Sequence, residues 1–238
     1  MHMKNCFFLV FAFFSYTYAH GQIYEDYEYK KEYLWGVNKN TNGGLIGGVF
    51  LRHSRSLGDG LFTTYGIELM NVKHPKEQRY TSTQTGSPFV WGKSNYLFTI
   101  RGQYGREKLL FRKASQQGVQ ISAGVAGGLS IGLEAPYLIT TQGAANYVQF
   151  DPDLYPNIGA IQGSGQVLQS IGNSSIVPGL NSKAYISFEF GAFRNNVAGV
   201  ELGASAEAFV REIVLIPTLE NRAFFPAFFF TFFWGTRR

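Results

Sequence analysis

One short stretch, His53-Ser54-Arg55-Ser56, contains the side chains of a hydrolase. A histidine that reaches a serine hydroxyl, oriented by an acid, activates that hydroxyl for attack on an ester. Here His53 directly precedes Ser54, and Ser56 follows two positions later. We interpret the stretch as an ordinary turn and expect no catalytic residue in it.

Metal and cofactor chemistry has little support in the residue spacing. The four histidines form no spaced pair with another ligand, and Cys6 is the only cysteine. The glycine-rich segments 43–48 and 124–128 are not followed by the Lys-Ser pair and helix of a phosphate-binding loop. We therefore expect neither a metal nor a cofactor.

Several charged residues stand alone within otherwise apolar segments. They are Glu68, Arg101, Glu134, Glu189, Glu201 and Glu207. A charge held away from bulk water must be paired or hydrated, because an isolated buried charge is very costly. The role of these residues therefore depends on the direction in which the surrounding secondary structure orients their side chains.

The clearest element is the segment 119–134, VQISAGVAGGLSIGLE. Apolar residues such as Ile121, Val125 and Leu129 occupy the odd positions, and Gln, Ser, Gly, Ala and Glu occupy the even ones. This period of two predicts a strand with one apolar and one polar face, since a helix would scatter the apolar residues around its axis.

Seven further segments read in the same way, giving about eight strands. They are 32–40, 44–53, 60–72, 96–105, 183–193, 198–210 and 223–235. The isolated charges fall on their polar faces.

Three all-β architectures fit these strands: a sandwich, a lipocalin-like barrel and a transmembrane barrel. The first two turn the apolar face inward, whereas the third turns it toward lipid. Here the polar face is rich in Gly, Ala and Ser, which suits a confined interior, and strands of this length suit a tilted bilayer crossing. We therefore predict an all-β, transmembrane antiparallel β-barrel of eight strands. Ten strands remain an alternative if part of 135–182 forms a hairpin.

Connection lengths and aromatic residues support this choice. The connections 73–95 and 135–182 are long, as expected of outer loops, and we expect the second to fold over the barrel mouth or to contact a partner. Aromatic side chains expected at the membrane interfaces are Tyr33, Trp35, Tyr65, Tyr96, Tyr104 and Trp234.

The start of the chain predicts export. Lys4 precedes an apolar run, and small residues at Ala19 and Gly21 complete a signal peptide over 1–21, with cleavage after Gly21 or after Ala19. A periplasmic segment, 22–31, and the barrel, 32–238, would follow.

Composition excludes other classes of protein. A mean hydropathy of −0.07 is too polar for a bundle of membrane helices. The net charge is +5, but the basic residues are scattered, so we expect no nucleic-acid partner. One local group, Arg106, Lys108, Arg112 and Lys113, could meet anionic headgroups or a periplasmic partner, although a solvated turn is the simpler interpretation.

With these residues in view, the chain resembles the small eight-stranded outer-membrane barrels of Gram-negative bacteria, the OmpA-like and OmpX-like class. The closing segment FFFTFFWG, 228–235, resembles their terminal aromatic strand, although four residues starting at Gly235 end the chain differently. The Tyr and Phe content and the NGG and NKN turns resemble Bacteroidota proteins. The resemblance implies an outer-membrane location with lipids as partners, and small barrels of this kind occur in secretion and assembly machines.

Three functions follow from these expectations. The first is a non-catalytic structural or interaction subunit of an envelope complex, whose long loops meet protein partners and whose lumen charges form a structural network. The second is a narrow passive pore for small solutes. The third is a lipid-modifying enzyme, although His53 and its serines depart from the His-x-Ser spacing of barrel deacylases.

Overall fold

The computed structural model describes residues 29–44, 46–112, 118–141, 147–190 and 196–238. The predicted signal peptide, 1–21, and most of the predicted periplasmic segment, 22–31, lie outside the described residues.

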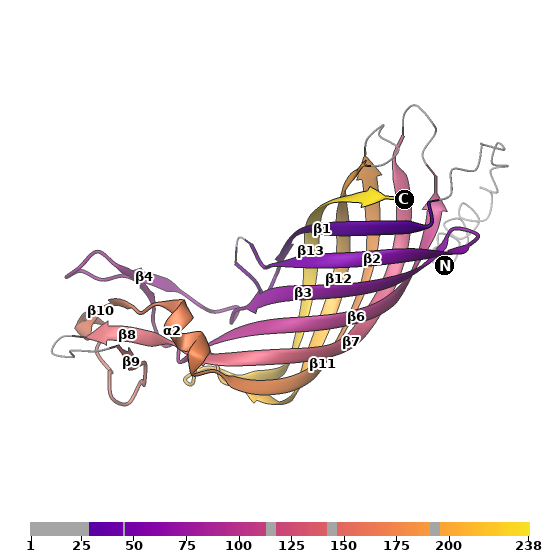
Figure 1. Cartoon of the computed structure of the whole chain (residues 1–238). Coiled ribbons are helices and arrows are strands. Elements are labelled where there is room, and N and C mark those ends of the chain that lie inside the picture. Colours follow the sequence, from indigo (N-terminus) through magenta and orange to yellow (C-terminus); the bar gives the residue numbers. More distant parts are fainter. Residues whose placement is uncertain (1–28, 45, 113–117, 142–146, 191–195) are drawn as a thin grey trace, which may run out of the picture.

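Eight strands form a closed antiparallel ring (Figure 1). They are β1 (Lys31–Asn40), β2 (Gly48–Gly58), β3 (Leu61–Val72), β6 (Asn95–Phe111), β7 (Gln120–Pro136), β11 (Ser175–Phe190), β12 (Asn196–Ile213) and β13 (Arg222–Arg237). Each strand pairs with its neighbours along the chain, and β1 pairs with β13 to close the ring. The predicted all-β, antiparallel barrel is confirmed with eight ring strands, and the described residues between β7 and β11, 137–141 and 147–174, add no strand to the ring.

The register of the ring fixes its dimensions. A row of paired residues that starts at Lys31 on β1 and passes once around the ring returns to β1 at Thr41, ten residues further along. With eight strands, this stagger tilts the strands by about 40° and makes the ring about 16 Å wide between backbones. Such an interior holds side chains and little else.

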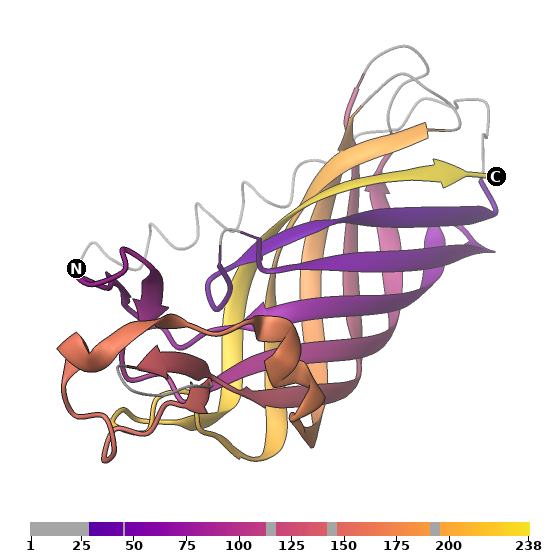
Figure 2. The same ribbon diagram turned by 60° about the vertical axis from the view of Figure 1, so that its left-hand side comes forward.

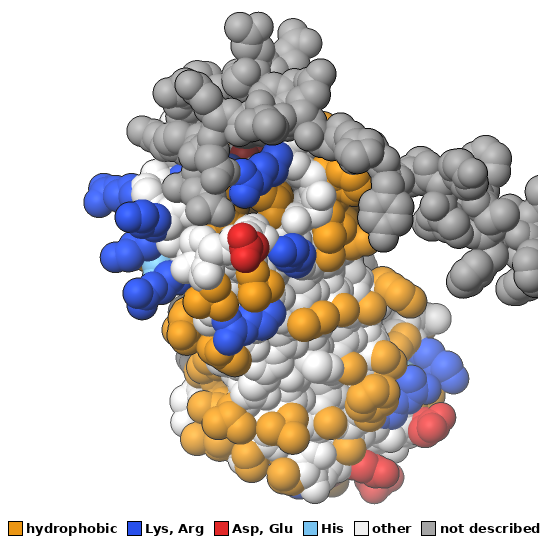
Figure 3. All heavy atoms as spheres, turned by 90° about the vertical axis from the view of Figure 1, so that its right-hand side faces the viewer, with side chains coloured by type: hydrophobic (Ala, Val, Ile, Leu, Met, Phe, Trp, Pro, Cys, Tyr) orange, Lys and Arg blue, Asp and Glu red, His pale blue; other side chains and the backbone are white. Residues whose placement is uncertain are grey.

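The two faces of the wall are inverted relative to a water-soluble protein. On β7, Val125 and Leu129 point outward and are 60% and 70% exposed, while Ser130 between outward positions is 2% exposed. The inward face contains most of the buried charged residues. Figure 3 shows apolar side chains spread over the wall, with many Lys and Arg side chains at the upper left of the view and others in its centre and at its right edge.

Several strands are longer than the sequence predicted. The strand predicted at 96–105 continues to Phe111, and the one predicted at 183–193 begins at Ser175. The strand predicted at 44–53 begins at Gly48 and continues to Gly58, where a turn with positive φ at Gly58, Asp59 and Gly60 leads into β3. The second long connection is therefore shorter than predicted, because residues 175–182 belong to β11, whereas the first, 73–94, has nearly its predicted length.

The two long connections form a lobe beyond one end of the ring (Figures 1 and 2). Its elements are β4 (Arg79–Thr81), β5 (Pro88–Val90), β8 (Leu138–Thr141), β9 (Val148–Gln149), the 3-10 turn η1 (Ile158–Ala160), β10 (Ile161–Ser164) and the helix α2 (Val167–Gly172). The β4–β5 hairpin and the three-stranded sheet of β8, β9 and β10 come from different connections.

An apolar core holds the lobe together. Phe89 and Val90 from the first connection pack with Tyr137, Ile139 and Phe150 from the second. Polar contacts tie the same segments, since the Ser82 hydroxyl donates to the Ile161 carbonyl at 3.0 Å. The second connection therefore packs on the first.

No helix in the described ranges is long and apolar enough to cross a membrane.

The close packing of inward rings against glycines gives a stability test. A Cβ at Gly124 would overlap the ring of Tyr185, whereas a Cβ at Gly102 would meet nothing closer than 3.9 Å. We expect Gly124→Ala to lower the free energy of unfolding by about 1–3 kcal/mol, the usual cost of overpacking. Urea unfolding in phospholipid vesicles, followed by tryptophan fluorescence, measures it. Gly102→Ala is the matched control, and an equal effect of both variants would contradict the packing.

Candidate functional site in the barrel lumen

The six charged residues predicted to face the lumen all point into the ring and are buried. Their side chains come from five strands: Glu68, Arg101, Glu134, Glu189, Glu201 and Glu207. The structure joins three of them, Glu68, Arg101 and Glu207, directly, because Arg101 contacts both carboxylates, and it connects Glu201 to them through Lys183.

The ion pairs form a chain of alternating charge, here called the lumen ladder: Glu207, Arg101, Glu68, Lys183, Glu201, Arg52, Glu107. In its first half, Arg101 Nη2 lies 2.8 Å from Glu207 Oε2 and its Nη1 lies 3.4 Å from Glu68 Oε2. Lys183 Nζ donates to Glu68 Oε1 at 2.9 Å. Each cation thus lies between two carboxylates.

The second half of the ladder leads toward the end of the barrel with the short turns. Lys183 Nζ also lies 2.9 Å from Glu201 Oε1, although that oxygen lacks hydrogen-bond geometry to any described group. Arg52 contacts Glu201 and lies 3.4 Å from Glu107 Oε2. The Tyr185 hydroxyl donates to Glu107 at 2.7 Å, and its ring lies 4.6 Å from the Arg52 guanidinium carbon.

Four of the six links of the ladder join strands that are not neighbours in the ring. Arg101 on β6 pairs with Glu207 on β12, and Lys183 on β11 pairs with Glu68 on β3. In both cases two strands lie between the partners around the ring. The ladder therefore braces separated strands across the lumen, in addition to the hydrogen bonds between neighbouring strands.

A second ionic cluster fills the end with the short turns. Arg237 Nε donates to Glu32 at 2.7 Å, and its guanidinium also contacts Glu189 and donates to the Tyr29 hydroxyl at 3.3 Å. Tyr29 stacks on Phe62 with ring centroids 4.8 Å apart. Glu189 thus belongs to this cluster through its contact with Arg237.

The lobe end of the lumen is apolar. Leu97, Phe209 and Phe225 pack there with Leu215 and Ile216 of the β12–β13 connection. Glu134 lies at this rim, where it accepts from Arg211 at 2.5 Å and from the Val214 amide at 3.2 Å. The mouth is therefore covered by the β12–β13 connection, whereas the lobe projects beyond it (Figure 1).

Sequence reasoning missed five of the eleven buried charged groups of the described lumen, together with Tyr185, although the alternation contained several of them. Lys183 and Tyr185 have the same parity as Glu189 on one strand, and Glu107 has the same parity as Arg101 on another. Glu107, Glu32 and Arg237 were missed because they lie at or beyond the predicted strand ends. Arg52 was missed because it shares its inward face with an aromatic residue, Phe50.

Five of the six predicted interface aromatics form an aromatic band on one side of the outer wall near the short turns, over β13, β1, β3 and β6. Trp35 and Trp234 lie with ring centroids 5.4 Å apart, and so do Tyr65 and Tyr104. Tyr33, the fifth, is 51% exposed. Tyr96 lies instead at the lobe end, where it packs edge-on against Tyr137.

The stretch around His53 does not assemble a catalytic pair. His53 points outward, stacks on Tyr33 at 4.4 Å and lies 3.1 Å from the Glu32 carbonyl oxygen through Nδ1. Ser54 points into the lumen and is 1% exposed, so adjacent residues on one strand face opposite sides of the wall. In the described ranges, no group of three or more His, Cys, Asp and Glu residues is placed to hold a metal ion.

The lobe contains one buried cation of its own. Lys93 is 1% exposed, donates to Glu77 Oε2 at 2.9 Å and lies 4.5 Å from the ring centroid of Tyr96. Burial lowers the pKa of its ammonium group, an effect that Glu77 opposes and that Lys73 and Arg79 increase. Burial also raises the pKa of the Tyr137 hydroxyl. Both groups are structural parts of the core that joins the two connections.

Comparison with known proteins gives only distant structural matches. No family model matches the chain, and no curated protein does. Two solved structures with similar topology are Ail, the attachment invasion locus protein of Yersinia pestis, and Neisserial surface protein A. Ail has a TM-score of 0.40 and 9% identity, over 89% of this chain and 99% of its own. Neisserial surface protein A has a TM-score of 0.40 and 8% identity, over 88% and 95%. At this distance the matches transfer no property to this chain.

The ladder predicts that the stability of the barrel depends strongly on the Glu201 carboxylate. Glu201 is completely buried between Arg52 and Lys183, so Glu201→Gln leaves two buried cations with less counter-charge. We expect the free energy of unfolding to fall by about 3–5 kcal/mol, as for other broken buried ion pairs. Urea titration in vesicles measures it. Glu212→Gln, on the same strand but exposed, should change stability by less than about 0.5 kcal/mol; equal effects would contradict the bracing role.

Proposed function

We propose that the chain is an integral outer-membrane β-barrel that serves as a structural or interaction subunit of a cell-envelope complex, without catalysis. The membrane location is supported by the inverted wall, in which Leu51, Val125 and Leu129 are more than half exposed while charges are buried. Lys39 also faces outward, but it lies one residue before the end of β1, within reach of the headgroups.

The orientation follows from the connections. Both described ends of the chain lie at the end with the short turns, where Lys31 and Arg238 exchange backbone hydrogen bonds at 2.9 Å. Outer-membrane barrels place short turns in the periplasm and long loops outside. The lobe would then face the cell exterior.

The lobe is the observation that supports an interaction role. Its core is formed by two connections that pack together, which is more structure than a connector needs. Its surface carries apolar side chains, with Leu154 70% exposed, Tyr147 41% and Ile158 40%. The filled lumen favours this surface as the functional one, because the ladder and the apolar mouth occupy the space that a solute would need.

Copurification tests the interaction role. We expect the tagged chain, extracted in mild detergent, to retain at least one envelope protein, and we expect Leu154→Asp with Ile158→Asp to lose it. Both side chains are exposed, so the lobe core should remain intact. Thr83→Asp, also exposed on the lobe, is the control that should retain the partner. A chain that always purifies alone, or whose partner is unaffected by the Leu154 and Ile158 changes, would contradict the proposal.

A further inference from the structure

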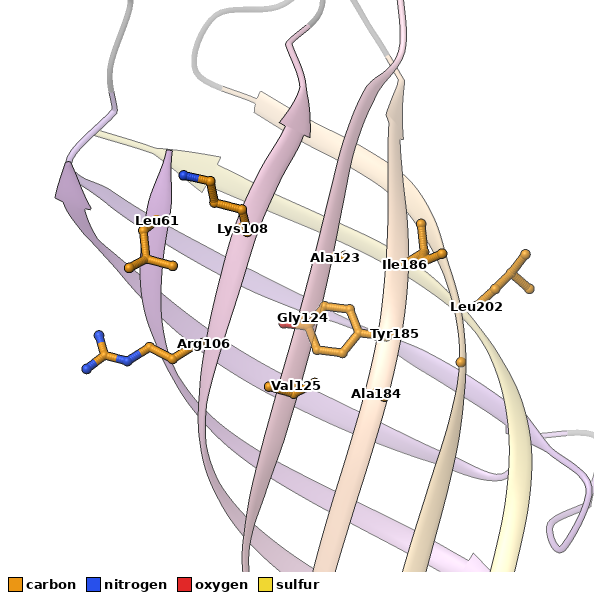
Figure 4. A pocket seen from close by; sticks show the side chains of 11 residues that line it. Leu61, Arg106, Lys108, Ala123, Gly124, Val125, Ala184, Tyr185, Ile186 and Leu202 are labelled. Atoms are coloured by element: carbon orange, nitrogen blue, oxygen red, sulfur yellow. The ribbon is translucent and has the colours of Figure 1, made fainter. Parts of the chain in front are cut away.

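A shallow groove of about 580 Å³ crosses the outer wall near the short turns (Figure 4). It runs over β6, β7, β11 and β12, and its floor contains the small residues Ala123, Gly124, Ala184 and Gly203. Leu61, Ile186 and Leu202 border it. The groove exists because outward positions that carry large side chains elsewhere are alanines here.

Two cations stand at one edge of this apolar groove. Arg106 and Lys108 are exposed on β6, and in the sheet register they lie opposite Val125 and Ala123 on the groove floor. Arg106 donates to the Thr63 hydroxyl, and Lys108 donates to the Asp59 carbonyl. Neither forms an ion pair with a carboxylate in the part of the chain that the structure describes.

The depth of the two cations suits a headgroup region. On the outward face of β6, Arg106 and Lys108 follow Tyr104, which belongs to the aromatic band. Aromatic bands mark the boundary between hydrocarbon and headgroups. The cations therefore lie on the headgroup side, while the groove runs from them toward Ala184 and the hydrocarbon.

The surrounding surface is also basic. Exposed cations at the short-turn end, besides Arg106 and Lys108, are Lys30, Lys31, Arg55, Arg112 and Arg238. Asp59 is the exposed carboxylate at this end among the described residues. Such a surface attracts anionic lipid.

We propose that the groove and the cations Arg106 and Lys108 form a binding site for one anionic diacyl phospholipid. An acyl chain lies along the floor of Ala123, Gly124 and Ala184, and the lipid phosphate lies between the two cations. The site rests on the proposed membrane location, because it faces lipid only if the wall does. The apolar groove suits a hydrocarbon tail, and the two cations beside it suit an anionic headgroup, so the ligand expected at this membrane boundary has both.

Native mass spectrometry of the detergent-refolded chain tests the charge requirement. With dioleoyl phosphatidylglycerol and dioleoyl phosphatidylcholine added in equal amounts, we expect one phosphatidylglycerol to be retained preferentially. Arg106→Gln with Lys108→Gln should lower that retention at least tenfold. Lys31→Gln with Arg55→Gln removes the same charge from the same basic end, away from the groove, and should lower it less than twofold. Equal losses in the two double variants would overturn the site in favour of diffuse attraction.

A groove-filling variant tests the apolar requirement. Ala184→Phe should lower phosphatidylglycerol retention at least fivefold with both cations in place, whereas Ala208→Phe, outward on β12 outside the groove, should not. Competition by glycerol phosphate alone, or a dimer that Ala184→Phe abolishes, would assign the surface to a free phosphate or to a second copy and overturn the proposal.

A gel assay on the same samples distinguishes failure of the lipid site from failure of the proposed membrane location. Each variant should migrate differently before and after boiling on a detergent gel, as a folded barrel does. Absent lipid retention with intact heat-modifiable migration would overturn the lipid site alone. A chain that stays soluble without detergent, and whose gel migration is unchanged by boiling, would overturn the proposed membrane location on which the lipid site rests.

Discussion

Closure of eight strands with a stagger of ten residues is the constraint on which the rest of the structure depends. Closure decides which residue of each adjacent pair faces the interior, and the narrow ring leaves that interior without bulk water. The charges that face inward must then satisfy one another. The alternation of Glu207, Arg101, Glu68, Lys183, Glu201, Arg52 and Glu107 is how this chain meets that requirement.

The interior of the ring is filled and braced by side chains, so the surfaces available to a partner are on the outside. The ladder joins β3 to β11 and β6 to β12 across the lumen, in addition to the hydrogen bonds that close the ring. What differs between the two ends is then the surface: a lobe with its own apolar core at one end, and a basic rim beside an apolar groove at the other. Both surfaces are built on this braced frame, and the proposed interaction role and the proposed lipid site depend on them.

Alternation predicted the ring and the direction of its faces, because a closed wall makes parity decisive for every residue in a strand. Ile121 and Ser122 were assigned to opposite faces from the sequence, and they lie there. The partners of the ladder could not be predicted, because pairing across the lumen depends on the stagger, which a sequence does not reveal. Glu189 and Glu207 have the same parity and residue type, yet they lie in different clusters. The lobe was also beyond prediction, since its core joins residues such as Phe89 and Ile161 across two connections with no shared periodicity.

The central claim is that the apolar face of the wall contacts hydrocarbon, and photolabelling tests it on the unaltered chain. The chain is reconstituted with a phospholipid that carries a diazirine within its acyl chain, irradiated, and mapped by peptide mass spectrometry. The account predicts label on Leu51, Val125 and Leu129 and none on their inward neighbours Arg52 and Ser130. Label distributed equally over both parities, or absent from Leu129 while present on Ser130, would contradict it.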